Sequence, residues 1–292
     1  MITSKYDIIS TMFSGKKQLP TLPSIFQNFN KVMNSPAVSS RKVADLIMKD
    51  QSMVVKILRL CNSAIYGRMK ETTSLTDAIN FLGFETLRRI ILQLSLIKMF
   101  KFNIAALPEF SVTTVWEHSI ATAHFADALA QKLRLQRGGQ FYLGGLLHDI
   151  GKVLIYEFYP KRFVEIVTIQ VQENIPDFRA EQRVLQADHT DIGAFVAEEW
   201  KFEKELVNAI GNHHSELKSR GSKTTALVTL ANLLARAGGL TFSWDSQDVD
   251  LMGNEAWHLL LPQAGPEEIE KVVFELLGEV DAIRRIVKEF VW

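Results

Sequence analysis

Apolar residues recur at intervals of three and four positions along most of the chain, and this spacing limits the fold more than any other feature of the sequence. Such spacing places apolar side chains on one face of an α-helix. No stretch shows the sustained two-residue alternation of a half-buried strand. We therefore predict an all-α protein. The clearest predicted helices are residues 24–34, 40–50, 51–62, 112–135, 139–156, 160–173, 178–186, 189–199 and 203–213.

Helix start and stop signals add detail to the first third of the chain. Ser74 has the side chain of an N-cap, and Asp77 three residues later suits the positive end of a helix. We predict a helix from there to Gly83 and a second helix over residues 85–100.

Breaks in the helical pattern predict three domain ranges. Pro108 interrupts the pattern, which indicates an N-terminal helical bundle over residues 1–107. A helical core follows over residues 108–240. Residues 241–292 form a C-terminal extension with one long amphipathic helix that begins at Pro266. Its apolar stripe suits core packing, and a homodimer interface is the alternative.

Positive and negative side chains balance, with 33 Lys and Arg against 33 Asp and Glu. The chain therefore has no overall field to attract nucleic acid or an anionic membrane, and we expect neither as a partner. The longest apolar run, residues 90–100, is too short to cross a bilayer. Cys61 is the single cysteine, and the first residues lack the pattern of a signal peptide. We expect a cytoplasmic protein.

The segment GGLLHDIGK, residues 144–152, contains the most reactive pair of side chains. His148 and Asp149 follow a run of small and apolar residues that must be buried. An ionised aspartate next to a core costs several kcal/mol unless something compensates its charge. A divalent cation, a helix N-terminus, or an arginine or lysine could supply that compensation.

Other histidines could join this pair. His118 lies on the apolar face of its helix, His189 begins a predicted helix, and His213 and His214 end another. Neutral imidazoles and a carboxylate suit Fe, Mn, Zn or Ni. Each histidine alone could equally be structural, paired within the core or placed at a helix C-terminus. Together with His148 and Asp149 the set favours a divalent metal.

Three longer segments resemble a known family. LRLCNSAIYG (58–67), SLTDAINFLGFETLRRIIL (74–92) and GGLLHDIGKVL (144–154) are together similar to an HDOD domain protein, and the resemblance covers roughly residues 19–237. It implies an N-terminal helical bundle packed on an HD-like helical core, related to the HD and HD-GYP phosphohydrolases. Family members are generally regarded as bacterial signalling or regulatory modules, usually without demonstrated catalysis.

The resemblance also implies a set of metal ligands, with two departures. Asn232 stands where the hydrolases have a closing aspartate, and Thr114 stands where HD-GYP proteins have a glutamate. A Gly-Tyr-Pro loop is missing from residues 215–223, which argues against cyclic di-GMP hydrolysis. One metal therefore fits better than a two-metal centre. The matched positions are His118, His148, Asp149, His189, His213, His214 and Asn232.

Two functions remain open. The first is a regulatory module without catalysis that binds a signalling protein or a small ligand. The second is a metal-dependent phosphohydrolase acting on a nucleotide or another phosphoester, with Asp149 and Lys152 as its catalytic residues. Lys152 could contact a phosphate in such an enzyme, or it could be a solvated lysine at a helix end.

Overall fold

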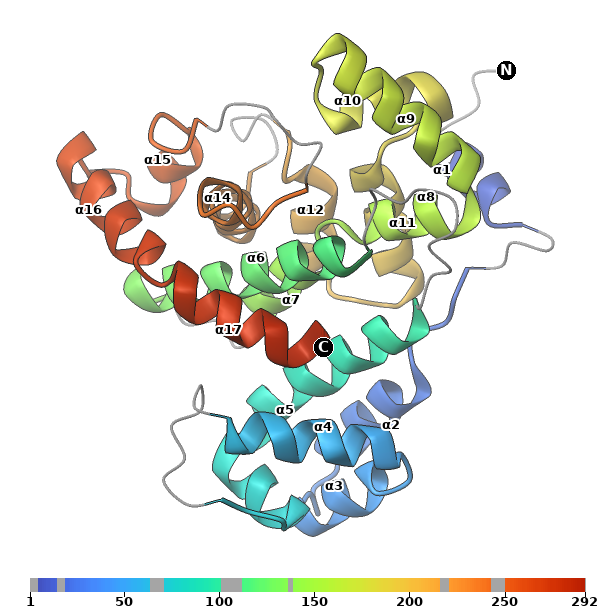
Figure 1. Ribbon diagram of the computed structural model, residues 1–292, viewed down its shortest axis with the longest axis vertical. Coiled ribbons are helices and arrows are strands. Elements are labelled where there is room, and N and C mark those ends of the chain that lie inside the picture. Colours follow the sequence, from blue (N-terminus) through green and yellow to red (C-terminus); the bar gives the residue numbers. More distant parts are fainter. Residues whose placement is uncertain are drawn as a thin grey trace. The chain divides into compact units, whose positions relative to one another are not determined.

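Over the residues that it describes, the computed structural model of the chain contains helices joined by turns and loops and no strands (Figure 1). This confirms the prediction of an all-α protein. The described residues are 5–14, 19–63, 71–100, 112–135, 139–215, 221–242 and 250–291.

The chain forms two compact units. The larger unit contains Met1–Pro20 and Phe102–Asp281, and the smaller contains Thr21–Lys101 and Ala282–Trp292. The chain thus passes from one unit to the other three times. The three predicted domain ranges stay predictions.

Among the described residues, the smaller unit contains four helices between residues 24 and 99 and most of a fifth, and side-chain caps set the starts of three of them. Ser39 caps α3, Asp50 caps α4 and Ser74 caps α5, each accepting a backbone N–H three residues later. The predicted N-cap at Ser74 is therefore confirmed. Phe26, Phe29, Ile47 and Ile57 are fully buried in this unit. The helices are α2 (Ser24–Met33), α3 (Ser40–Ile47), α4 (Gln51–Asn62) and α5 (Leu75–Met99).

Helix α5 is interrupted where the sequence predicts a break. Gly83 has φ 75° and ψ 162°, a conformation that is essentially restricted to glycine. The last residues of the chain complete this unit: Glu289 Oε2 lies 3.1 Å from the Nε of Arg59 on α4.

The larger unit holds most of the helices. Helix α6 packs along α7 and α14, and α11 packs along α12 and α8 (Figure 1). Trp116, Phe125 and Trp257 are among its largest fully buried side chains. The helices are α1 (Lys5–Met12), α6 (Val112–Lys132), α7 (Gln140–Leu147), α8 (Ile150–Phe158), α9 (Pro160–Glu173), α10 (Asp177–Leu185), α11 (His189–Glu199), α12 (Lys204–Asn212), α14 (Lys223–Ala237), α15 (Ala256–Leu260) and α16 (Pro266–Leu277), with α17 (Val280–Val291) running on into the smaller unit.

Helix α1 was not expected from the sequence, and it belongs to the larger unit. Lys5 forms an ion pair of 2.7 Å with Asp191 on α11. The Tyr159 hydroxyl donates a 2.6 Å hydrogen bond to the carbonyl oxygen of Met12. The apolar pattern of this segment is short, and its contacts are with residues far along the chain.

The prediction of one continuous helix over residues 139–156 is wrong. The segment divides into α7 and α8, because Asp149 leaves the helical conformation at φ −100° and ψ 14°. His148 and Asp149 therefore lie at a helix junction.

The single amphipathic helix predicted to begin at Pro266 is also divided, into α16 and α17. Gly278 ends α16 with its N–H bonded to Phe274 and the next N–H bonded to Leu276. The predicted apolar stripe is confirmed as largely buried, at Ile269, Val272, Val273, Leu276, Ile283 and Val287.

A search of the described helices for a membrane span found none long and apolar enough.

Candidate metal centre

The junction between α7 and α8 brings three helices close together. A Cβ atom placed on Gly151 would lie 2.0 Å from the carbonyl oxygen of His189, so only glycine lets α8 pack this closely against the start of α11. That start is fixed by Asp188, whose side chain accepts the N–H groups of Thr190 and Asp191. His189 is thereby held beside Asp149.

Two histidines face one oxygen of the Asp149 carboxylate. His148 Nε2 lies 3.4 Å from Asp149 Oδ2, and His118 Nε2, on α6, lies 3.8 Å from it. The two Nε2 atoms are 3.2 Å apart. His118 is 2% exposed, and His148 and Asp149 are completely buried.

Two further histidines face the other oxygen. His189 Nε2 lies 3.3 Å from Asp149 Oδ1, and His213 Nε2 lies 3.8 Å from it. These two Nε2 atoms are 3.4 Å apart. The ring of His214 is centred 4.2 Å from the ring of His213. Ligand atoms of His189, His213 and His214 lie within 4.8 Å of one another, as do those of His118, His148 and Asp149.

Four of these histidines also contact an oxygen atom through their other ring nitrogen, Nδ1. Because a carbonyl oxygen can only accept, Nδ1 carries the hydrogen in three of these bonds. When such a ring is neutral, its Nε2 presents a lone pair toward Asp149. The bonds run from His118 to Leu240 (2.7 Å), from His148 to Gly145 (2.7 Å) and from His213 to Ile210 (2.8 Å), and His189 Nδ1 contacts Glu181 Oε2 (2.7 Å).

Burial keeps several rings neutral. Burial, with a smaller contribution from His148, lowers the pKa of His118 to about 3. Burial also lowers the pKa of His214 to about 3, and it holds the pKa of His213 well below its ordinary range. Burial alone would raise the pKa of Asp149, but His148 and Lys152 hold it well below its usual value. A buried carboxylate beside the neutral imidazoles of His118, His213 and His214 offers ligands of the kind that divalent metals take.

Asn232, on α14, lies at the same centre. It lines a small cavity together with His118 and His214. Its Oδ1 atom is buried and has no hydrogen-bond partner among the described residues, and the same holds for His214 Nε2 and Asp149 Oδ1. The structure therefore brings all seven candidate residues together. That they bind a metal stays a prediction.

The interpretation of Lys152 as a solvated lysine at a helix end is wrong. Its side chain is only 11% exposed, and its Nζ lies 2.9 Å from Asp149 Oδ2 and 2.7 Å from Asp177 Oδ2. The ammonium also lies 4.9 Å from the centre of the Phe242 ring. Lys152 is therefore an internal counter-charge of the cluster, and its contact with a phosphate remains untested.

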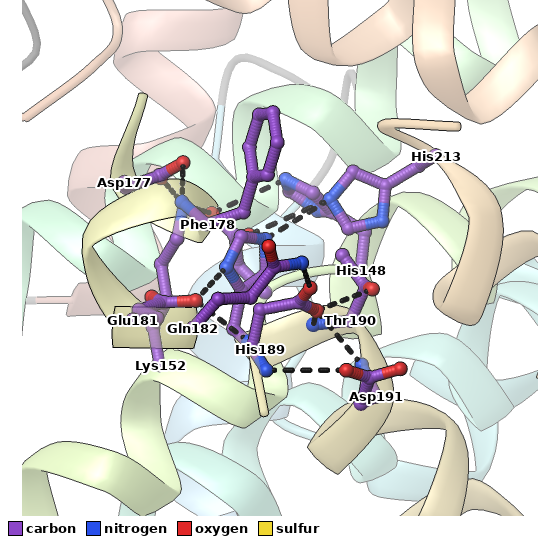
Figure 2. Close-up of polar contacts among 12 residues, drawn as sticks. His148, Lys152, Asp177, Phe178, Glu181, Gln182, His189, Thr190, Asp191 and His213 are labelled. Carbon is purple, nitrogen blue, oxygen red and sulfur yellow. Dashed lines mark hydrogen bonds and ion pairs between the residues drawn. The ribbon is translucent and has the colours of Figure 1, made fainter. Parts of the chain in front are cut away.

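Two acids on α10 were missed by sequence reasoning. Glu181 is 3% exposed, and its Oε2 lies 2.7 Å from both the backbone nitrogen and the Nδ1 of His189 (Figure 2). Asp177 lies one helical turn before it and pairs with Lys152. Their spacing of four residues places both on one face of the helix. This spacing was the one feature of the sequence that could have identified them.

The contact between Glu181 and His189 gives a pH-dependent prediction. Burial by itself lowers the pKa of His189, but the Glu181 carboxylate outweighs it and raises the pKa to about 9 in the metal-free protein. Glu181→Gln should therefore bring the His189 pKa below its ordinary 6.5. The pKa of His189 is higher in the folded protein than its ordinary value of 6.5. The contact therefore stabilises the metal-free protein fully at pH values below 6.5, and this stabilisation is lost as the pH rises through about 9.

NMR titration of the histidine ring carbons, in protein treated with a chelator, would measure this pKa. Glu165→Gln, an exposed change on α9, is the control and should leave the His189 pKa where it is. A His189 pKa that is unchanged in Glu181→Gln would contradict the assigned contact.

The fold and the site together define a class: an all-α protein whose buried histidines converge on one aspartate at a helix junction. The chain belongs to the HDOD family, since the sequence model of the HDOD domain matches residues 19–216. This confirms the resemblance seen in the sequence.

Solved structures agree with this assignment. An HDOD domain protein of unknown function from Geobacter sulfurreducens is 27% identical, with a TM-score of 0.83 over 98% of each chain. A protein from Shewanella amazonensis is 22% identical, with a TM-score of 0.74 over 98% of each chain, and this likeness shows the fold alone.

Curated relatives are longer than this chain. An uncharacterized protein of Treponema pallidum is 26% identical over 198 residues, which are 68% of this chain and 38% of that protein. Ribonuclease Y of Enterococcus faecalis is 30% identical over 126 residues, which are 42% of this chain and 18% of that enzyme.

Proposed function

We propose that this HDOD protein is a regulatory module that binds one divalent metal ion and does not hydrolyse phosphoesters. The volume of the cavity at this centre is the main support for the absence of phosphoester hydrolysis. The described residues leave a cavity of about 70 Å³ beside His118, His214 and Asn232. Pockets for substrates the size of a nucleotide typically hold about 300 Å³ or more.

The charges at the centre support the same proposal. Asn232 offers a neutral oxygen, so the ligand set has one carboxylate, that of Asp149. Two metal ions held close together need more anionic ligands than this. Lys152 is already paired with two carboxylates, which neutralise the positive charge that it would offer to a phosphate group.

A bound metal would have a structural consequence. His118, Asp149, His189 and His213 lie on or beside α6, α8, α11 and α12. One ion among them would connect elements that are far apart in the sequence. We propose that the surface stabilised in this way is recognised by a signalling protein or a small ligand.

A metal-dependent phosphohydrolase is the second candidate. The similarity to ribonuclease Y and the two groups of ligand atoms that meet at Asp149 favour it. In such an enzyme the metal would act as a Lewis acid on a phosphoester. Asp149 would hold the ion, and Lys152 would have to leave one of its carboxylate partners to contact the substrate.

Metal analysis and an activity assay on the same preparation would separate the two candidates. The chain is purified without a histidine tag or chelator, under low oxygen, and its metal content is measured by mass spectrometry. Hydrolysis of bis(p-nitrophenyl) phosphate, cyclic di-GMP and a short RNA is then followed. We expect about one ion of Fe, Mn, Zn or Ni per chain and no turnover above a blank without protein. Turnover that increases with metal content would support the hydrolase, and a metal-free preparation that does not take up added metal would contradict both.

A further inference from the structure

The smaller unit contains a cavity that is separate from the candidate metal centre. Helices α2, α3 and α4 pack on α5 (Figure 1). They leave a cavity of about 420 Å³ between the start of α2, the corner from α3 to α4, and the end of α5. Pockets that hold small molecules typically have volumes from about 300 to 1,000 Å³. This cavity is therefore large enough for a small ligand.

The inner walls of the cavity are largely apolar. Met53 is 3% exposed, and Ile25, Leu46 and Met99 are half-buried, so their side chains present apolar surface to the cavity. Ser95 is also buried there, but its hydroxyl already donates a hydrogen bond to a backbone carbonyl one helical turn earlier. These walls favour a ligand with an apolar body.

The exposed rim of the cavity carries a positive charge without a partner. Lys98 Nζ lies 2.9 Å from Asp50 Oδ2, and Asp50 Oδ1 accepts the N–H of Met53 at 3.2 Å, so both oxygens of this carboxylate are occupied. Lys49 is exposed, lines the same cavity and has no hydrogen-bond or ion-pair partner among the described residues. An unpaired ammonium beside a neutralised ion pair attracts an anion.

The start of α2 adds hydrogen-bond donors to the same cavity. Pro23 holds the N-cap position and has no side chain that can accept a hydrogen bond, whereas Ser39 and Asp50 cap α3 and α4. The N–H groups of Ser24 and Ile25 have no acceptor among the described residues, and both residues line the cavity. Uncapped N–H groups at a helix start favour an anionic acceptor, which agrees with the charge of the rim.

We propose that this cavity binds a small carboxylic acid with an apolar body. The apolar part would lie against Leu46, Met53 and Met99, and the carboxylate would lie at the rim, near Lys49 and the start of α2. The proposal stands on the smaller unit alone and does not rest on the proposed function. In the simpler alternative, the cavity holds only solvent and Lys49 is an ordinary surface lysine.

Binding of matched eight-carbon compounds to the full chain tests the proposal. Octanoate, octanol and octylammonium share one apolar chain and differ in the charge of the head group. Calorimetric titration should give octanoate a Kd below about 1 mM. Octanol and octylammonium should bind at least about tenfold more weakly, because they cannot accept charge-assisted hydrogen bonds. Acetate lacks the apolar chain and should bind at least about a hundredfold more weakly.

Methionine methyl signals in NMR spectra locate the bound compound. Octanoate should shift the signals of Met53 and Met99, which line the cavity. It should leave the signal of Met252 unchanged, because this residue lies in the larger unit. A shift of Met252 without shifts of Met53 and Met99 would place the compound elsewhere and overturn the proposal.

Variants at the rim separate the charge, the N–H group and the side chain. Lys49→Met should weaken octanoate binding about tenfold, and Lys42→Met, at an exposed position on α3 outside the cavity, is its control. Ser24→Pro removes an N–H group at the first position of α2, where proline is well tolerated, and should also weaken binding about tenfold. Ser24→Ala keeps that N–H group and should bind octanoate as the wild type does. Circular dichroism would confirm that each variant is folded.

Several results would overturn the proposal. Octanoate could bind the wild type no more tightly than acetate does, or no more tightly than octanol or octylammonium. Equal octanoate affinity in the wild type, Lys49→Met and Ser24→Pro would show that the carboxylate does not lie at the rim. If a second copy of the chain filled the cavity, concentrated protein would dimerise in analytical ultracentrifugation and octanoate would not shift Met53. None of these results depends on the metal content, so the proposed function is tested separately.

Discussion

Replacing Asp149 with alanine should reduce the bound metal from about one ion per chain to less than about a tenth, while the helical content stays the same. Asp149 supplies the one carboxylate in the two groups of candidate ligands, and the Nε2 atoms of four histidines lie within 3.8 Å of its oxygens. Without it the remaining ligands are neutral, and they provide much weaker attraction for a divalent ion.

The fold should tolerate this change, because Asp149→Ala does not leave an unpaired buried charge. Lys152 keeps its 2.7 Å ion pair with Asp177. Elemental analysis and circular dichroism on one preparation would check both parts of the prediction. Asp45→Ala, an exposed change on α3, is the control and should keep the metal. Asp149→Ala protein that binds as much metal as this control would rule out the centre.

Replacing Gly151 with alanine should destabilise the larger unit by about 3 kcal/mol or more, a fall in Tm on the order of 10 °C. The new Cβ would lie 2.0 Å from the carbonyl oxygen of His189 and 2.7 Å from its Cα and C atoms. Those are backbone atoms, so no flexible side chain can move aside. Either α8 or α11 must shift, and His189 with it, so bound metal should decrease as well.

Tryptophan fluorescence during urea unfolding suits this test, because Trp116, Trp200 and Trp257 belong to the larger unit. Gly265→Ala is a matched control: a Cβ there meets nothing within 4 Å, and φ is −80°. We expect it to cost less than about 1 kcal/mol. Equal stability of the two variants would show that α8 and α11 are not packed as closely as the structure has them.

Much of the fold followed from the spacing of apolar residues. The helices of the smaller unit and those from α9 to α12 lie close to where the periodicity predicts them. The two divided helices could not be predicted in the same way. The segment over residues 139–156 is mostly apolar, and its break lies next to the close contact between Gly151 and the start of α11, which comes later in the sequence.

The candidate site could also be predicted only in part. His148, Asp149 and the other histidines can be recognised in the sequence, because few other residue types bind metals. Glu181 and Asp177 do not stand out, since acids spaced by four residues are common on solvated helices. Their burial depends on Lys152 and His189, which tertiary packing brings to α10. Nothing local in the sequence distinguishes them from surface residues.

The order of the units along the chain has a consequence for folding. The ion pair between Lys5 on helix α1 and Asp191 spans 186 positions. The smaller unit is in the same situation, since Arg59 is 230 positions from its partner Glu289. Contacts between such distant residues form late, because a long loop must close first. Neither unit can therefore complete its packing from a short stretch of chain, because helix α1 needs Asp191 and the smaller unit needs the segment around Glu289.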